Sequence, residues 1–263
     1  MPVSRLNRSL LRLTGDNVKE WLSGLVTNTL TQDMNFAALL TPQGKIIADF
    51  CVTKDETGLI LDTPQKFGSL LEKRLALYKL RAPIQIDNIS DEYSVYAIWG
   101  DEKGQEVTFQ GYDDPRHASL GRRVISKSDI PSDGDYNAHR LSLGVVESEW
   151  DFETSTTFPA DANMDLMHGV DFKKGCFIGQ EVVSRMKRMT TVKKRMRGVI
   201  LEGSAQAGDK IMGGDRVIGE LLSVHEQMGM AMIRLNRWKE AEVEPTINDM
   251  NIEIMDSVDG HSG

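Results

Sequence analysis

The sequence predicts an α+β fold that ends in a small β-rich module. Strand-like and helix-like segments mix along the first 190 residues, without the strict alternation that builds a doubly wound parallel sheet. From residue 192 to residue 232, glycines such as Gly219 separate short apolar runs, a pattern typical of short strands joined by turns. We therefore expect an α+β body at 1–190, a C-terminal β-rich domain at 191–255, and a disordered tail at 256–263.

The elements of the body follow from apolar spacing and from turn residues. Apolar runs between turns predict strands at residues 5–13, 37–40, 45–53, 59–62, 84–89 and 93–99. Helical spacing predicts helices after the N-cap Asp16, from Pro64 to Pro83, at 136–146 and at 180–187. The stretch from Gly100 to Gly121 is rich in loop residues.

The N-terminal residues allow two interpretations. Residues 4–13 are rich in Arg and Ser and contain no acid, a composition also typical of a transit peptide. They lead directly into the first predicted helix, without the spacer that a removable peptide needs. We therefore interpret them as the first strand, and we expect a protein of the bacterial cytoplasm rather than of the mitochondrial matrix.

Composition excludes several classes of protein. The 263 residues include no apolar run near the roughly 20 residues that span a membrane, and the net charge of −8 does not favour nucleic acid as a partner. The segment 182–201 nevertheless contains seven Lys and Arg residues and no acid. The two cysteines lie far apart, and the five histidines lack ligand spacing, so we expect no metal site. We expect a monomer.

One loop combines several features of a reactive site. Gly175 and Gly179 frame Cys176, allowing tight backbone turns on both sides of the thiol. Lys174 and the start of a predicted helix are close by, and positive charge of this kind favours the reactive thiolate. A buried structural cysteine is the alternative. Cys51, within an apolar predicted strand, is interpreted as a core residue.

The same loop resembles a known family signature. The run Lys174-Gly-Cys-Phe-Ile-Gly-Gln-Glu181, followed four residues later by Arg185, is similar to the signature of the YgfZ family of folate-binding proteins. That family is related to mitochondrial iron–sulfur assembly factors and to the glycine-cleavage T-protein, an aminomethyltransferase. Further matching segments at 13–16, 41–45, 78–83 and 158–159 extend the resemblance over residues 9–238. It implies a GcvT/YgfZ-like three-lobed ring around a central channel that binds tetrahydrofolate. In this ring, residues 1–190 would form a discontinuous body of two interleaved α+β sub-domains, and the C-terminal β-rich domain would be barrel-like.

The resemblance also implies site residues. Asp161 stands where the T-protein places an acid on the pterin, and Arg185 suits a folate carboxylate. The motif residues implied to surround the folate are Lys174, Gly175, Gly179, Gln180 and Glu181. Asp49 stands where the T-protein has its catalytic acid, although this chain has one acid there where the T-protein shows two. A folate polyglutamate tail or a solvated basic face would account for Lys187, Arg188 and Lys193.

Three functions follow as hypotheses. The first is a tetrahydrofolate-binding accessory protein for the assembly or repair of iron–sulfur enzymes, with Cys176 as a thiol or a transient ligand and the assembly machinery as partner. The second is a folate-dependent one-carbon transferase that depends on Asp49 or Asp161. The third is an RNA-associated module, for example in tRNA modification, which the acidic total charge and the lack of aromatic residues in the basic segment disfavour. Catalytic turnover is left open.

Overall fold

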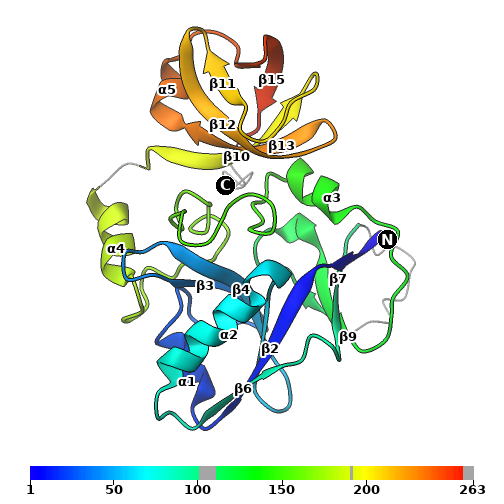
Figure 1. Cartoon of the computed structure of the whole chain (residues 1–263), viewed down its shortest axis with the longest axis vertical. Coiled ribbons are helices and arrows are strands. Elements are labelled where there is room, and N and C mark those ends of the chain that lie inside the picture. The colour runs from blue at the N-terminus through cyan, green and yellow to red at the C-terminus, as the bar shows by residue number, and fades with distance from the viewer. Residues whose placement is uncertain (101–110, 190–191, 257–263) are drawn as a thin grey trace.

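The computed structural model describes residues 1–100, 111–189 and 192–256 of the chain (Figure 1). It has three lobes: a five-stranded sheet with two helices, a four-stranded sheet, and a closed six-stranded barrel. All strand pairs are antiparallel, which is consistent with the predicted α+β class. None of the helices in these described ranges is long and apolar enough to cross a membrane.

The five-stranded sheet forms the lower part of the body in Figure 1. Its order is β3-β4-β5-β2-β6, with the bounds β2 Arg8–Gly15, β3 Met34–Leu40, β4 Ile46–Lys54, β5 Leu59–Pro64 and β6 Ile84–Asn88. Helices α1 (Val18–Ser23) and α2 (Gln65–Lys79) cover one face. Their buried residues Leu22 and Leu71 belong to the same apolar cluster as Phe50 of β4. The opposite face is therefore the one that turns toward the centre of the protein.

The four-stranded sheet has the order β1-β7-β9-β8. Its strands are β1 Val3–Leu6, β7 Ser94–Ile98, β8 Tyr112–Asp113 and β9 Arg122–Ser126. Strands β1 and β2 follow one another in the chain but pair in different sheets. The N-terminal segment predicted as one strand is thus two strands, and it joins the two sheets.

The long segment between the sheets and the barrel has little regular structure. Helix α3 (Tyr136–Ser142) precedes it, and α4 (Gln180–Met189) ends it. Its buried residues Met164, Met167 and Phe177 pack in one cluster with Phe36 and Ala38 of β3. This segment therefore fills the centre of the protein, on the sheet face that α1 and α2 leave open.

A cluster of buried ions joins the two sheets. Its six charged side chains are each at most 6% exposed, and three are cations and three are anions: Arg8, Asp62, Asp114, Arg116, Arg123 and Glu147. Arg123 of β9 reaches Asp62 of β5 at 2.5 Å, and Arg116 reaches Glu147 at 2.7 Å. Burial of so many charges is tolerated because each has an opposite charge within hydrogen-bond distance.

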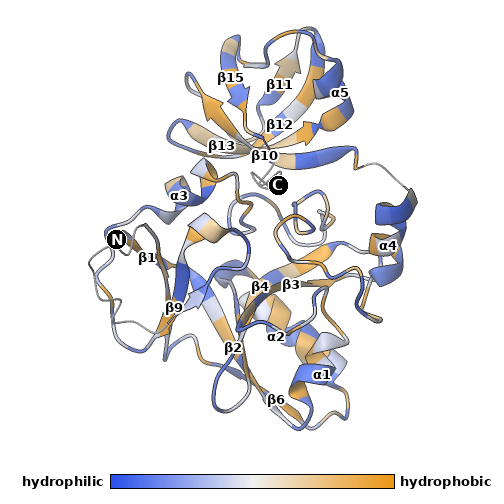
Figure 2. Cartoon of the chain, turned by 180° about the vertical axis from the view of Figure 1, so that it is seen from behind, coloured by the Kyte–Doolittle hydropathy of each residue, from blue (hydrophilic) through white to orange (hydrophobic). Residues whose placement is uncertain are grey.

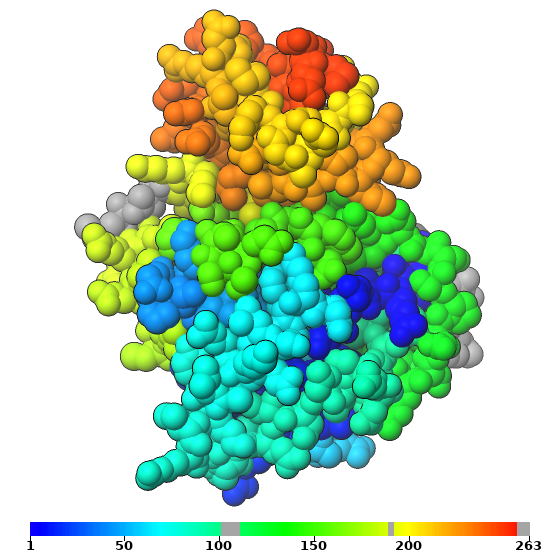
Figure 3. Space-filling model, in the orientation of Figure 1, coloured from blue at the N-terminus to red at the C-terminus, as the bar shows by residue number. Residues whose placement is uncertain are grey.

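The C-terminal barrel rests on the body (Figure 3). Its closed order is β10-β13-β12-β11-β14-β15, with the bounds β10 Lys194–Leu201, β11 Lys210–Gly213, β12 Arg216–His225, β13 Met228–Arg234, β14 Thr246–Ile247 and β15 Met250–Ile254. Helix α5 (Leu235–Glu240) follows β13. His225 of the barrel pairs with Asp135 of the body at 2.6 Å, and the Ser223 hydroxyl donates to Asp151 at 2.5 Å.

Several predicted details differ from the structure. Asn17, and not Asp16, precedes α1, with a left-handed backbone at φ 58°. Helix α3 ends at Ser142 rather than at residue 146, because Gly144 adopts φ +64° and turns the chain away. Strand β9 and helix α5 were not predicted. The predicted domain boundary at 190/191 and nearly all of the predicted disordered tail lie outside the described residues.

Candidate functional site

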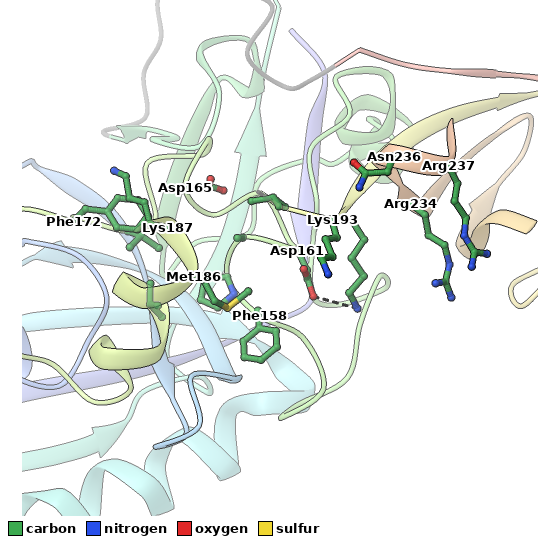
Figure 4. Close-up of a pocket in the computed structure, with 16 residues that line it drawn as sticks. Phe158, Asp161, Asp165, Phe172, Met186, Lys187, Lys193, Arg234, Asn236 and Arg237 are labelled. Carbon is green, nitrogen blue, oxygen red and sulfur yellow. Dashed lines mark ion pairs between the residues drawn. The ribbon is translucent and has the colours of Figure 1, made fainter. Parts of the chain in front are cut away.

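A cavity of about 680 Å³ lies where the body meets the barrel (Figure 4). One wall is the turn at residues 158–165, a second is α4, and the third is formed by the start of β10 with the end of β13 and α5. The volume is within the range of about 300–1,000 Å³ that is typical of small-molecule sites. The first two walls come before residues 190–191 in the chain, and the third comes after them.

The inner part of the cavity is apolar. Phe158, Val170, Phe172, Val183 and Met186 line it. Helix α4 is mostly hydrophilic (Figure 2). Its residues 186 and 187 follow residue 183 by three and four positions, so all three lie on the one side of the helix that faces the cavity. This inner part can therefore hold a flat apolar ring system.

Asp161 places a buried carboxylate at the edge of this apolar part. The residue is 3% exposed, and the Met196 amide of β10 donates to its backbone carbonyl at 2.8 Å. Its Oδ2 lies 3.2 Å from the Lys194 ammonium, yet that oxygen accepts no hydrogen bond from the described residues. A buried carboxylate oxygen without a hydrogen bond is unfavourable, so this atom is suited to a donor from a ligand.

Lys45 lies close enough to Asp161 to feel its charge. Its ammonium lies 3.4 Å from the centre of the Phe158 ring and donates to the Thr156 carbonyl at 2.8 Å. Burial lowers the pKa of Lys45, while the charge of Asp161 acts in the opposite direction. Lys45 therefore fixes the Phe158 ring beside Asp161.

The outer part of the cavity is basic. Lys193, and Arg234 and Arg237 at the end of the barrel, line it, whereas Lys187 of α4 lies over the Phe172 ring of the apolar part, with its ammonium 3.6 Å from the ring centre. In Figure 4 the two arginines lie on the barrel, on the side of Asp161 opposite to Phe172 and Lys187. Arg234 and Arg237 were not predicted as site residues, because no local pattern in the sequence connects them with the motif loop.

The motif loop lies apart from this cavity lining. Cys176 is exposed, whereas Cys51 is buried. The Lys174 ammonium donates to the backbone carbonyls of Val26 at 2.8 Å and of Asn28 at 3.0 Å. Burial lowers the pKa of Lys174 to about 8. Lys174 therefore anchors the loop to the body, outside this cavity lining.

The other motif residues shape the loop or face solvent. Gly179 has φ +79°, and a Cβ there would lie 2.7 Å from the Thr41 carbonyl, so this position requires glycine. The Gln180 side chain donates to the Lys174 carbonyl at 3.3 Å. Gly175, Glu181 and Arg185 are exposed and lie outside the cavity lining.

Arg185 lies on a different side of α4 from the residues that line the cavity. An α-helix turns by about 100° per residue, so Arg185 points about 200° away from the cavity residue Val183. The structure thus places Asp161 in the cavity together with Lys187 and Lys193, and places Arg185 on another side of α4. Arg188 is also exposed and outside the lining.

Asp49 lies in the interior, away from the cavity lining. It is 4% exposed and accepts a hydrogen bond from the Ser148 hydroxyl. Burial, and next the charge of Glu147, raise the pKa of Asp49. Burial likewise raises the pKa of Cys51 to about 12. Both side chains therefore have the character of core groups.

Comparison with known proteins bears on the fold. The glycine cleavage system aminomethyltransferase T of Bartonella henselae superimposes with a TM-score of 0.74, covering 97% of this chain and 85% of that one at 16% identity. The chain has the aminomethyltransferase T fold. Residues 193–256, which contain the barrel, match the family described as CAF17, C-terminal beta-barrel domain. The T-protein-like fold and the barrel expected from the sequence resemblance are thus confirmed.

The sequence relatives are iron–sulfur cluster assembly factors. A mitochondrial IBA57 homologue of Neurospora crassa is 28% identical over 76% of this chain, and one of Phaeosphaeria nodorum is 31% identical over 77%. This chain spans about half of each of these two relatives, 54% and 56%. Human mitochondrial IBA57 is 26% identical over 89% of this chain and 76% of its own length. These names contradict the expected bacterial cytoplasmic location, which was inferred from the strand-like N-terminal residues alone and is wrong.

Proposed function

We propose that this chain is a tetrahydrofolate-binding accessory protein that acts in mitochondria in the assembly or repair of iron–sulfur enzymes. The similarity to the IBA57 relatives supports the iron–sulfur role and the mitochondrial location. The cavity between body and barrel supports the folate part of the proposal. Iron–sulfur proteins or their assembly machinery are the partners on this view.

The observation that carries the proposal is the buried carboxylate of Asp161, whose Oδ2 lies 3.2 Å from the Lys194 ammonium but accepts no hydrogen bond from the described residues. A pterin presents an amino group and a neighbouring ring N–H along one edge, and a carboxylate can accept both hydrogen bonds. Charge-assisted hydrogen bonds of this kind are short and strong. Phe158 and Met186 supply apolar surface for the ring beside Asp161. The residues present therefore fit the pterin end of a folate.

Cys176 suits a different task on the same protein. Its thiol is exposed but lies outside the cavity lining, so a partner protein can reach it without displacing the folate. A cysteine thiolate is a soft ligand that binds iron in clusters. We assign it to the transient contact with the iron–sulfur client, while the bound folate occupies the junction of body and barrel.

Of the other two hypotheses, neither gains a specific observation. A one-carbon transferase that acts through Asp49 would need this acid at the ligand, whereas Asp49 is buried and hydrogen-bonded to Ser148; Asp161 lines the cavity and does not separate the two hypotheses. For the RNA hypothesis, the basic residues Arg185 and Arg188 are exposed on α4, as is usual for a helix face in contact with solvent. The accessory function therefore accounts for more of the structure.

Calorimetric titration with 5-formyltetrahydrofolate, which is stable in air, tests the proposal. Asp161→Asn keeps the shape of the side chain but loses the charge, and it should weaken binding by about 1.5–3 kcal/mol, or about 10- to 150-fold. The exposed Asp113, on β8 outside the cavity, offers the control Asp113→Asn, which should bind as the unchanged protein does. Equal affinities for all three proteins would remove Asp161 from the site. No binding by the unchanged protein would refute the folate proposal.

A further inference from the structure

A second cavity, of about 420 Å³, lies beside the N-terminal strand, and we call it the N-terminal cavity. Its walls are residues 4–8, where β1 leads into β2, residues 133–137 at the start of α3, and the turn at residues 147–150. Figures 1 and 2 both show the N-terminus beside α3, and in Figure 3 the dark blue N-terminal residues reach the surface. It shares no lining residue with the cavity at Asp161, so the proposed folate site does not account for it.

The lining of the N-terminal cavity leaves two carboxylates without an ion pair. Four of its ionisable side chains have an ionisable partner within 4.0 Å: Arg5, Arg8, Asp135 and Glu147. The other two, Asp133 and Glu149, form no ion pair with another described residue. The charge that is left unpaired in this lining is therefore negative.

Glu149 has the less satisfied carboxylate of the two. Its Oε1 accepts a hydrogen bond from the side-chain amide of Asn7 at 3.0 Å, and this partner is neutral. Its Oε2 is buried and accepts no hydrogen bond from the described residues. A buried carboxylate oxygen without a hydrogen bond is unfavourable, and a charged donor stabilises it more than a neutral donor does. Glu149 is therefore suited to a cationic donor from a ligand.

Trp150 gives the same cavity an aromatic wall. The residue lines the cavity and is 40% exposed. The guanidinium of Arg140, which is fully buried and paired with Asp151, lies 4.9 Å from the centre of the Trp150 ring. This contact holds the ring in place from the protein interior. An organic cation is commonly bound where an aromatic ring and a carboxylate meet, because both attract positive charge.

We propose that the N-terminal cavity binds an alkylammonium group. Glu149 accepts hydrogen bonds from the ammonium, which offers three donors, and Trp150 covers the methylene groups beside it. Asp133 is exposed and adds a second negative charge to the lining. A free polyamine and a lysine side chain of another protein both present this group. The inference is independent of folate binding.

An inorganic cation is the other ligand that unpaired carboxylates could attract. The described part of the chain contains no group of three His, Cys, Asp or Glu side chains that could hold a metal ion. Calcium takes about six to eight oxygen ligands, and an indole ring supplies none. The geometry therefore favours an organic cation.

Calorimetric titration of the full chain with spermidine and with Nα-acetyllysine amide tests the site. About 0.15 M salt screens loose attraction to a protein of net charge −8, so binding at this site should saturate at one ligand per chain. Glu149→Gln keeps the shape of the side chain but loses the charge, and it should weaken binding at least about tenfold. Asp133→Asn, at an exposed position, should weaken binding about two- to fivefold.

Two controls match these measurements. The exposed Glu202, outside the cavity lining, offers Glu202→Gln, which should bind as the unchanged protein does. Nα-acetylnorleucine amide has the alkyl chain without the ammonium, and it should not bind. Thermal unfolding shows whether each variant is folded, and Asp133→Asn tests the site even if Glu149→Gln is not.

The two sources of the ammonium give different results. Tighter binding of spermidine than of acetyllysine amide would assign the site to a free polyamine, and the reverse order would assign it to a lysine of a partner protein. No saturable binding of either amine, or equal affinities in all variants, would overturn the proposal. Displacement of the bound amine by calcium chloride at equal concentration would also overturn it, in favour of an inorganic cation.

Discussion

The buried ion cluster makes Glu147 a sensitive position for stability. Its two oxygens accept from Arg8 at 2.9 Å and from Arg116 at 2.7 Å, and its side chain is 2% exposed. Glu147→Gln would remove the negative charge that Arg8 and Arg116 share inside the protein. Burial alone would raise the pKa of Glu147, but Arg116, Arg8 and Arg123 outweigh it and lower the pKa from 4.5 to about 2. That difference corresponds to about 3 kcal/mol.

The same pKa change determines how stability depends on pH. Because the folded protein holds this carboxylate ionised more strongly than the unfolded chain does, the contribution is complete above pH 4.5. It is lost as the pH falls from 4.5 toward about 2. Glu147→Gln should therefore lower the free energy of unfolding by about 3 kcal/mol at pH 7, and should flatten the loss of stability in acid.

Urea unfolding at pH 7 and in steps down to pH 3 measures both effects. The exposed residue Glu181 offers the control Glu181→Gln, which should stay within about 0.5 kcal/mol of the unchanged protein. If Glu147→Gln lost less than about 1 kcal/mol at pH 7 and kept the same acid profile, the cluster would not join the sheets in the way its distances indicate.

Two further predictions concern the cysteines and Asp49. Iodoacetamide at neutral pH should label the exposed Cys176 first, because Cys51 is 2% exposed and burial raises its pKa to about 12. Mass spectrometry identifies the labelled residue, and labelling of Cys51 first would contradict the prediction. With each variant as the only copy in cells, Cys176→Ser should abolish the activity of an iron–sulfur reporter enzyme without changing folate affinity or Tm, and Asp49→Asn should leave the reporter near normal. The reverse pattern would favour a one-carbon transferase.

Much of the fold could be predicted because local spacing determines it. Strands such as β4 and β5, and helix α2 after Pro64, lie close to their expected places. Strand β9 was missed for a physical reason: it begins with Arg122 and Arg123, which suggest an exposed loop. Arg123 is in fact 1% exposed, and its partner Asp62 is 61 positions away in the sequence. Only the tertiary structure supplies that partner.

Residues that line the cavity could be predicted where they belong to one continuous segment of the sequence. Asp161 was named from the resemblance, and the structure places it in the cavity. The arrangement of α4 was also present in the sequence, since helical spacing from Val183 includes Lys187 and leaves out Arg185. Arg234 and Arg237 were beyond reach, because the barrel brings them to the cavity from more than 40 positions further along the chain than α4.

The closed barrel limits how a partner protein can attach. Within the described residues every barrel strand has a hydrogen-bonded neighbour on both sides, although β11 and β14 pair only at Met212 and Thr246, so the barrel offers no strand with a whole free edge for strand addition. The described sheets of the body end at β3 and β6, and at β1 and β8. Among the described strands, β-augmentation is therefore favoured at the sheets of the body, and a protein that contacts the barrel would be recognised mainly through side chains. Client choice at the barrel can then diverge through surface substitutions that leave its backbone hydrogen bonds intact.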